Sequence, residues 1–236
     1  MELTKVSTTI SSSGFKAVVY GGAGSGKTYQ AGLLTDAGYK VLLISAEAGL
    51  RTLAKWPNID VIDLNKFPIE KRIDKLIEAY QWIEKTKPKY DTIMIDSLTE
   101  INQCLVASLK LKYPDEKMTL KLYGENSEKM QMLCKSFRDL PYNVVLISQS
   151  EVEKDDVGRR FTIPSLIGKV SNLLPYYFDS VIFLSKDDKG NRTAQTEASN
   201  NIVAKNRGGN LLPTEPADLG KIFNKVNANK IGEIKK

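Results

Sequence analysis

The stretch YGGAGSGKT, residues 20–28, decides the fold class of this chain. Its Gly21 is followed by four residues and then by Gly26-Lys27-Thr28, the spacing of a phosphate-binding Walker A loop. An apolar run, FKAVVY at 15–20, precedes the glycines, and a helical pattern follows them. A strand, a glycine-rich loop and a helix in this order let backbone N–H groups and a helix N-terminus surround a phosphate. The stretch therefore predicts a site for a nucleoside triphosphate.

We expect the ligand to be ATP with Mg²⁺. In loops of this kind the lysine reaches the β- and γ-phosphates, and the hydroxyl of the next residue coordinates the metal. Here these residues are Lys27 and Thr28. The residues predicted to bind the nucleotide are Gly21, Gly22, Ala23, Gly24, Ser25, Gly26, Lys27 and Thr28.

Apolar runs typical of strands covered on both faces recur along the chain. They lie at 15–20, 39–46, 91–96, 143–149, 179–184 and 201–206. Between them, 68–87 and 126–140 carry apolar residues at helical spacing, and a proline follows each segment. This alternation predicts an α/β fold with a mainly parallel sheet flanked by helices. A turn signal at 188–191 predicts a C-terminal β-hairpin that ends the sheet.

The length of 236 residues favours a single domain. We expect a flexible N-terminal arm at 1–14, an ATPase domain at 15–224 and a basic C-terminal tail at 225–236. The alternative for the tail is that its lysines contact phosphates.

Composition excludes several kinds of site. The chain has no histidine and two cysteines, Cys104 and Cys134, which argues against a disulfide framework, a His/Cys zinc site and a Ser-His-Asp triad. The formal net charge of +6 permits a polyanionic partner without requiring one. No apolar run reaches the roughly 18 residues that cross a bilayer, and residues 1–15 lack the apolar core of a signal peptide. We therefore expect no membrane partner and a cytoplasmic location.

Two acidic residues follow predicted strands at the edge where the Walker A loop lies. Asp96 follows Ile93-Met94-Ile95 and suits a ligand of the outer shell of Mg²⁺. Ser97 comes next, where many P-loop ATPases have a glutamate, so the carboxylate that activates water must come from elsewhere. Glu47 directly follows the run at 39–46, at the same carboxyl edge of the sheet. Its alternative role is that of an acid favoured at a helix N-terminus.

Together these residues resemble the RecA-like ATPase family over about residues 15–210. The order of motifs is Gly21 to Thr28, then Glu47, Asp96-Ser97 and a strand that ends in Gln149. The resemblance implies that Glu47 activates water, and that Gln149 senses the γ-phosphate and passes the signal to the following loop. A strand-end glutamine satisfied by the backbone is the alternative for Gln149.

Lys205 and Arg207 in the stretch AKNRGG form a further pair, two residues apart. On a strand they would point to one face. RecA-like recombinases and hexameric helicases carry a similar pair late in the core. The resemblance implies that these cations reach the γ-phosphate in a neighbouring subunit, and hence a homo-oligomer, either a ring or a filament. A solvated pair of surface cations is the alternative.

The stretches VVYGGAGSGKT, TIMIDSLTEI and KNRGG, with IPSLIGKV, are most similar to phage-encoded RecA-like nucleotide-binding proteins, a group that includes minimal recombinases implicated in single-strand annealing. The resemblance implies a DNA-stimulated ATPase that acts on single-stranded DNA in recombination, annealing or replication, in the cytoplasm of a bacterial host. A phage single-strand-binding protein is a further expected partner.

Two segments combine cations with aromatic side chains, which suits phosphate contact and base stacking. The loop expected after Gln149 contributes Arg159, Arg160, Phe161 and Lys169 as candidate DNA contacts, although the part before Arg159 is weakly negative. The insertion at 109–124 contributes Lys110, Lys112, Tyr113, Lys117, Lys121 and Tyr123.

The sequence leaves two other functions as alternatives. A P-loop kinase for a small molecule has a similar length, but it should show an arginine-rich lid and an acidic residue that binds the acceptor, and it would not require the KNRGG stretch. A nucleotide-switched assembly scaffold with little turnover would bind ATP without depending on Glu47.

Overall fold

The computed structural model describes residues 13–114 and 120–232. The strands are β1 (Lys16–Gly21), β2 (Val41–Ser45), β3 (Asp60–Asp63), β4 (Thr92–Asp96), β5 (Asn143–Lys154), β6 (Arg160–Pro164), β7 (Ser180–Lys186), β8 (Arg192–Gln195), β9 (Lys205–Asn206) and β10 (Thr214–Pro216). The α-helices are α2 (Gln30–Asp36), α3 (Arg72–Thr86), α4 (Leu98–Lys112), α5 (Leu120–Arg138), α6 (Val170–Tyr177) and α7 (Leu219–Gly232). Short 3-10 turns at Leu50–Leu53, Leu64–Lys66 and Ile69–Lys71 complete the elements.

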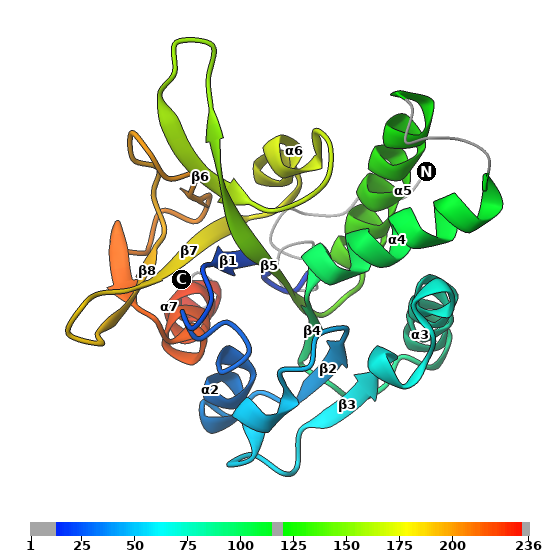
Figure 1. Ribbon diagram of the computed structural model, residues 1–236. Helices are drawn as coiled ribbons and strands as arrows, with labels where there is room; N and C mark the ends of the chain where they lie inside the picture. The colour runs from blue at the N-terminus through cyan, green and yellow to red at the C-terminus, as the bar shows by residue number, and fades with distance from the viewer. Residues whose placement is uncertain (1–12, 115–119, 233–236) are drawn as a thin grey trace, which may run out of the picture.

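The sheet has the strand order β10-β8-β7-β1-β5-β4-β2-β3, with β1 near its centre (Figure 1). The contacts among β7, β1, β5, β4, β2 and β3 are parallel, and the pairs β7–β8, β8–β10, β5–β6 and β7–β9 are antiparallel. The predicted α/β fold with a mainly parallel sheet is therefore confirmed.

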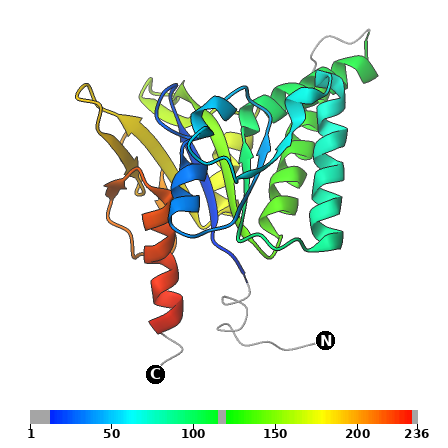
Figure 2. The same cartoon turned by 90° about the horizontal axis from the view of Figure 1, so that it is seen from below.

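Helices cover both faces of the sheet, which explains why the interiors of the central strands are mainly apolar. Alternate residues of β1 divide between the faces: Val18 and Tyr20 pack with α3, α4, α5 and α6, whereas Ala17 and Val19 pack with α2 and α7. Figure 2 shows α2 and α7 on the side away from α3, α4 and α5. Parallel strands buried in this way need no polar residue until they end. The polar site residues consequently gather at the strand ends.

The predicted hairpin near the C-terminus is present as β7 and β8. The turn between them includes Gly190 at φ 89°, and Asp187 Oδ1 accepts a hydrogen bond of 2.7 Å from the backbone N–H of Asn191. Strand β10 pairs with β8 and forms this edge of the sheet.

The segment 201–206, predicted as one strand, contains only the two-residue strand β9. Before β9, Ile202 forms two isolated β-bridges, one with Thr162 and one with Ser199. The hydroxyl of the buried Tyr20 also donates to the Val203 carbonyl over 2.6 Å. The ladder with β7 is therefore limited to Lys205 and Asn206.

The N-terminal arm predicted at 1–14 lies almost wholly outside the described residues. At the other end, α7 passes through residue 225 without a break (Figure 2). Leu219, Ile222 and Phe223 are buried, and Lys225 pairs with the buried Glu215 at 2.6 Å. None of the helices in the described ranges is long and apolar enough to cross a bilayer.

Candidate nucleotide-binding and hydrolysis site

The Walker A segment joins the end of β1 to the start of α2, as expected for a phosphate-binding loop. Gly24 and Gly26 have φ values of 74° and 93°, in the region that side chains disfavour. Lys27 Nζ donates to the carbonyl oxygens of Gly21 and Gly22, each over 2.9 Å. The lysine thus lies along the phosphate-binding loop, as the Walker A motif predicts.

Asp96 lies at the end of β4 and faces the same loop. Thr28 Oγ1 donates to Asp96 Oδ2 over 2.6 Å. The other oxygen, Oδ1, is buried and has no hydrogen-bond partner within the described residues. Burial raises the pKa of Asp96 to about 6, against the opposing effects of Thr28 and Lys27.

These residues fit a Mg²⁺-nucleotide. The unpaired carboxylate oxygen of Asp96 lies beside the Thr28 hydroxyl, and oxygen ligands of this kind are the ones that Mg²⁺ prefers. The Ser25 hydroxyl in the loop is likewise buried without a partner in the described part of the chain. Burial lowers the pKa of Lys27, while Glu47 and Asp96 raise it, which suits a cation that meets phosphate.

Glu47 lies just beyond the end of β2 and connects the neighbouring motifs. Its Oε1 accepts hydrogen bonds from Ser97 Oγ and, over 3.0 Å, from Gln149 Nε2. Its backbone N–H donates to the Asp96 carbonyl over 3.2 Å. The structure therefore brings together the three side chains that the motif order connects, Glu47, Asp96 and Gln149. The role of each in hydrolysis remains a prediction.

A cavity of about 670 Å³ lies over the Walker A loop. The glycine loop, Lys27, Thr28, Glu47 and Gln149 line it, together with four residues that sequence reasoning missed: Tyr29, Thr52, Ser150 and Arg192. Tyr29 and Ser150 directly follow recognised motifs and could have been included by adjacency. Arg192 carries no such signal, because only the packing of β8 beside β7 brings it to the Walker A loop.

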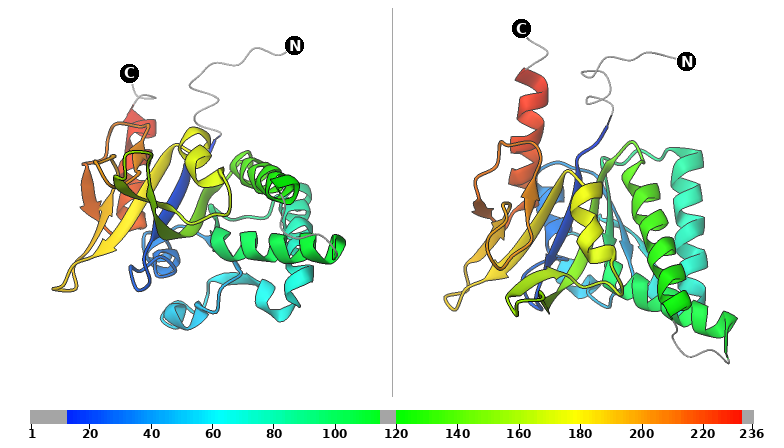
Figure 3. Two further views of the ribbon diagram at one scale, coloured as in Figure 1. Left: turned by 45° about the horizontal axis from the view of Figure 1, so that its top comes forward. Right: turned by 90° about the horizontal axis from the view of Figure 1, so that it is seen from above.

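The segment after Gln149 is a β-hairpin, where the sequence predicted a loop. Strand β5 continues to Lys154, and β6 returns antiparallel to it, so that the hairpin projects beyond the sheet (Figures 1 and 3). The alternation of Val152 with Glu151 and Glu153 is typical of a strand, and the sequence reasoning considered only the charge of this segment. At the base of the hairpin, Ser165 N–H donates to the Gln149 carbonyl over 2.8 Å.

The candidate DNA residues differ in their surroundings. Arg159 is exposed, but its guanidinium pairs with Asp155 at 2.7 Å. Arg160 is exposed at the start of β6, and Phe161 is half-buried beside it. Lys169 is exposed just before α6, away from the hairpin tip. In the insertion, Lys112 and Lys121 stand over the ring of Tyr113, and Lys117 lies outside the described residues.

Lys205 and Arg207 do not reach the Walker A loop of their own chain. Strand β9 pairs with Ser180 at the beginning of β7, whereas Gly21 pairs with Leu184 near the end of β7. The two cations therefore lie toward the opposite edge of the sheet from the loop. Any contact that they make with a Walker A site must involve another copy of the chain.

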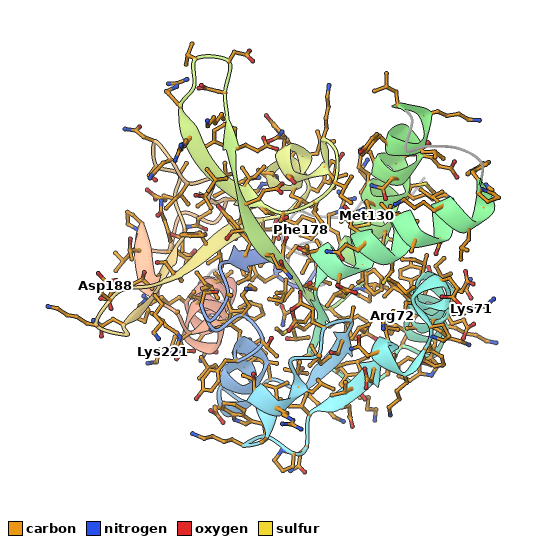
Figure 4. The ribbon with its side chains drawn as sticks, in the orientation of Figure 1. Lys71, Arg72, Met130, Phe178, Asp188 and Lys221 are labelled. Carbon is orange, nitrogen blue, oxygen red and sulfur yellow. The ribbon has the colours of Figure 1, made fainter. Side chains whose placement is uncertain are left out.

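Within the chain, the two cations have separate partners. Lys205 Nζ donates to the carbonyl oxygens of Pro175 and Phe178, the second over 3.1 Å, and burial lowers its pKa. Phe178 follows α6 in the core (Figure 4). Arg207 is more than half exposed and pairs with Asp179 at 3.6 Å. Arg207 is thus the better placed of the two to contact a second molecule.

Comparison with known proteins places the chain in a family. The family model for an AAA domain matches residues 13–208. No curated protein matches the sequence. Among solved structures, a prototypical ATPase from the type III secretion system of pathogenic bacteria shares 15% identity at a TM-score of 0.49, over 72% of this chain and 51% of that one. The RadB recombinase shares 21% identity at a TM-score of 0.44, over 77% of this chain and 81% of that one. This chain thus matches about half the length of the secretion ATPase.

Proposed function

We propose that this chain, which belongs to the AAA domain family and has a RecA-like P-loop ATPase fold, hydrolyses Mg²⁺-ATP. Hydrolysis would control its binding to single-stranded DNA. The observation that carries the proposal is the hydrogen bond of 3.0 Å between Gln149 and Glu47. Glu47 faces the nucleotide cavity, and Gln149 lies in the strand that becomes the projecting hairpin. One contact therefore connects the proposed site of hydrolysis to the projecting hairpin of β5 and β6.

Each group in the cavity has a distinct part in hydrolysis. Lys27 and the amides of the Walker A loop bind the phosphates, and Thr28 with Asp96 would hold the metal. Mg²⁺, when bound, neutralises charge on the phosphate oxygens. Glu47 orients a water molecule and accepts its proton as the water oxygen bonds to the γ-phosphorus and the bond to the β-phosphate oxygen breaks. The products are ADP and inorganic phosphate.

Gln149 supports the proposed coupling because its side chain and its backbone have different partners. The side chain donates to Glu47, while the backbone N–H donates to Thr99 Oγ1 over 2.9 Å and the carbonyl accepts from Ser165. A γ-phosphate that competes with Glu47 for the amide would move a residue at the hairpin base. An amide can make this exchange without a change of charge.

Single-stranded DNA is the proposed partner, and recombination, annealing or replication in a phage life cycle is the proposed context. Arg160 and Phe161 are adjacent at the start of β6 and join an exposed cation to an aromatic ring. This combination binds single strands with little regard for sequence, because every base has a stacking face. The acidic residues at the turn, with Asp155 already paired to Arg159, confine the candidate surface to β6.

We expect ATP to strengthen binding to single-stranded DNA, in a salt-sensitive manner that Arg160→Ala reduces. Each phosphate neutralised on a single strand contributes a slope of about −0.7 to log affinity against log salt, so this variant should flatten the slope by about 0.7. Phe161→Ala should weaken binding by about 5-fold or more without changing the slope, because stacking releases few ions. The measurement is fluorescence anisotropy of a labelled oligothymidine with ADP or a slowly hydrolysed ATP analogue, over a series of salt concentrations.

Lys85→Ala is the matched control, since it removes an exposed cation from α3. It should leave both affinity and slope unchanged. Equal affinity with the two nucleotides, together with no effect of Arg160 or Phe161, would contradict the DNA proposal and favour a nucleotide-switched scaffold.

We also propose that Arg207 acts on ATP bound to a neighbouring copy in a ring or filament. Arg207→Ala should then lower ATPase activity at least 10-fold without changing the nucleotide affinity of the isolated chain, since arginines supplied in trans contribute roughly 10³ to 10⁵ in rate. Mixing this variant with Glu47→Gln should restore activity at interfaces that combine intact Glu47 with intact Arg207. The measurement is phosphate release, with oligomer mass recorded in the same samples. Mixed oligomers that show no recovery would exclude action in trans.

A further inference from the structure

We propose that Arg192 binds the nucleotide from within the same chain, through the α- or β-phosphate. The inference deepens the proposed function and rests on it, because it takes ATP as the ligand of the cavity. No sequence motif identifies this arginine, and it lies more than 160 positions after the Walker A loop.

Arg192 reaches the Walker A loop from strand β8. A Cβ atom placed on Gly26 would lie 3.2 Å from Arg192 Cδ and 3.3 Å from its Nε. The arginine side chain therefore lies directly against the loop, and it lines the same cavity as Lys27 and Thr28. A glycine at 26 leaves the space that this side chain uses.

The guanidinium of Arg192 is free to take a ligand. No ion pair and no side-chain hydrogen bond connects it to another residue in 13–114 or 120–232, and the side chain is exposed. Asp187, in the turn before Arg192, accepts hydrogen bonds from Asn191. A planar group with five N–H donors at the rim of a phosphate-binding loop matches phosphate oxygens in geometry and charge.

The backbone of Arg192 is fixed relative to the loop by a buried glutamine. Gln30 Nε2 donates to the Gly26 carbonyl over 3.2 Å and to the Ala217 carbonyl over 3.1 Å. The N–H of Ala217 in turn donates to the Arg192 carbonyl over 3.3 Å. The glutamine oxygen accepts from Leu219 N–H, at the start of α7. Positions fixed in this way reduce the ordering that ligand binding would otherwise require.

The sheet order decides which phosphates Arg192 meets. Strand β8 lies on one side of β1, whereas β5 and β2, which position Gln149 and Glu47, lie on the other. Arg192 therefore approaches Gly26 from the side opposite the residues proposed to act at the γ-phosphate. We place its contact at phosphates that ATP and ADP have in common.

The test compares Arg192→Ala with Arg192→Lys and with Lys189→Ala. Lys189 is an exposed cation in the β7–β8 turn, and it follows Asp188, which Figure 4 labels, in the sequence. Kd values for ATP and for ADP are measured by isothermal titration calorimetry, and hydrolysis is measured at saturating ATP. We expect Arg192→Ala to weaken both nucleotides to a similar extent, by about 10-fold or more, because hydrogen bonds between charged groups are the strong ones. Arg192→Lys should recover part of the loss, the rate at saturation should change little, and Lys189→Ala should match the wild type.

Three results would overturn the inference, and they differ in what else they imply. If Arg192→Ala binds both nucleotides like the wild type while Lys27→Ala does not bind, only the role of Arg192 fails. A loss confined to ATP, with a slower rate at saturation, would move the contact to the γ-phosphate. If the wild-type protein binds neither nucleotide, the proposed function fails as well. Thermal unfolding of each variant identifies any loss that comes from the fold.

Discussion

Replacement of Lys27 by alanine is expected to remove productive binding of Mg²⁺-ATP. The ammonium group lies along the Walker A loop and donates to the carbonyl oxygens of Gly21 and Gly22. Charge-assisted hydrogen bonds each contribute about 1.5–3 kcal/mol, so the loss of contacts to two phosphates should weaken affinity by roughly 100-fold or more. Equilibrium binding of a fluorescent ATP analogue measures the change.

The fold of the Lys27 variant must be checked, because the lysine also bonds to its own loop. Lys40→Ala is the matched control: it removes a cation outside the cavity, and this variant should bind ATP normally. The prediction would be wrong if Lys27→Ala kept both the unfolding midpoint and the ATP affinity of the wild type. Lys27 would then make no contribution to ATP binding.

Glu47→Gln is expected to bind ATP normally and to hydrolyse it about 100-fold more slowly or worse. A general base contributes typically 10² to 10⁴ in rate, and an amide of the same shape cannot accept the proton from water. The substitution keeps an oxygen that can accept from Ser97 and Gln149, so the cavity should retain its shape. Single-turnover phosphate release and nucleotide affinity, measured on the same samples, separate chemistry from binding.

Glu100 provides the matched control for Glu47. It lies three residues after Ser97, but its carboxylate pairs with Arg72 at 3.4 Å and does not line the nucleotide cavity. Glu100→Gln should therefore hydrolyse ATP at the wild-type rate. A slow Glu100 variant beside a normal Glu47 variant would reverse the assignment of the base.

The nucleotide loop and the strands could be predicted from the sequence because their signals are local. The spacing of Gly21, Gly26, Lys27 and Thr28 reflects backbone requirements within nine residues. Apolar runs without alternation indicate strands with two covered faces, whatever covers them. Asp96 and Glu47 could also be placed, since parallel strands end at one edge of a sheet.

Predictions that depended on the path of the chain between elements were less reliable. The segment after Gln149 was expected to be a loop because of the resemblance to RecA-like proteins, yet it forms a hairpin in which β6 pairs with the backbone of β5. Lys205 and Arg207 were expected to act as a pair, and the sequence did not indicate that Lys205 donates to the carbonyl oxygens of Pro175 and Phe178. Which acceptor a lysine finds depends on residues that are distant in sequence.

The sequence by itself determined the class of fold, the phosphate-binding loop and the order of the motifs along the chain. Only the tertiary structure decided that Glu47, Ser97 and Gln149 form one hydrogen-bonded group, and that Arg192 lies over Gly26. The physical reason is that a motif encodes the conformation of its own backbone over a few residues. The meeting of side chains from β2, β4, β5 and β8 depends on strand order and register, which arise from burial of the whole sheet.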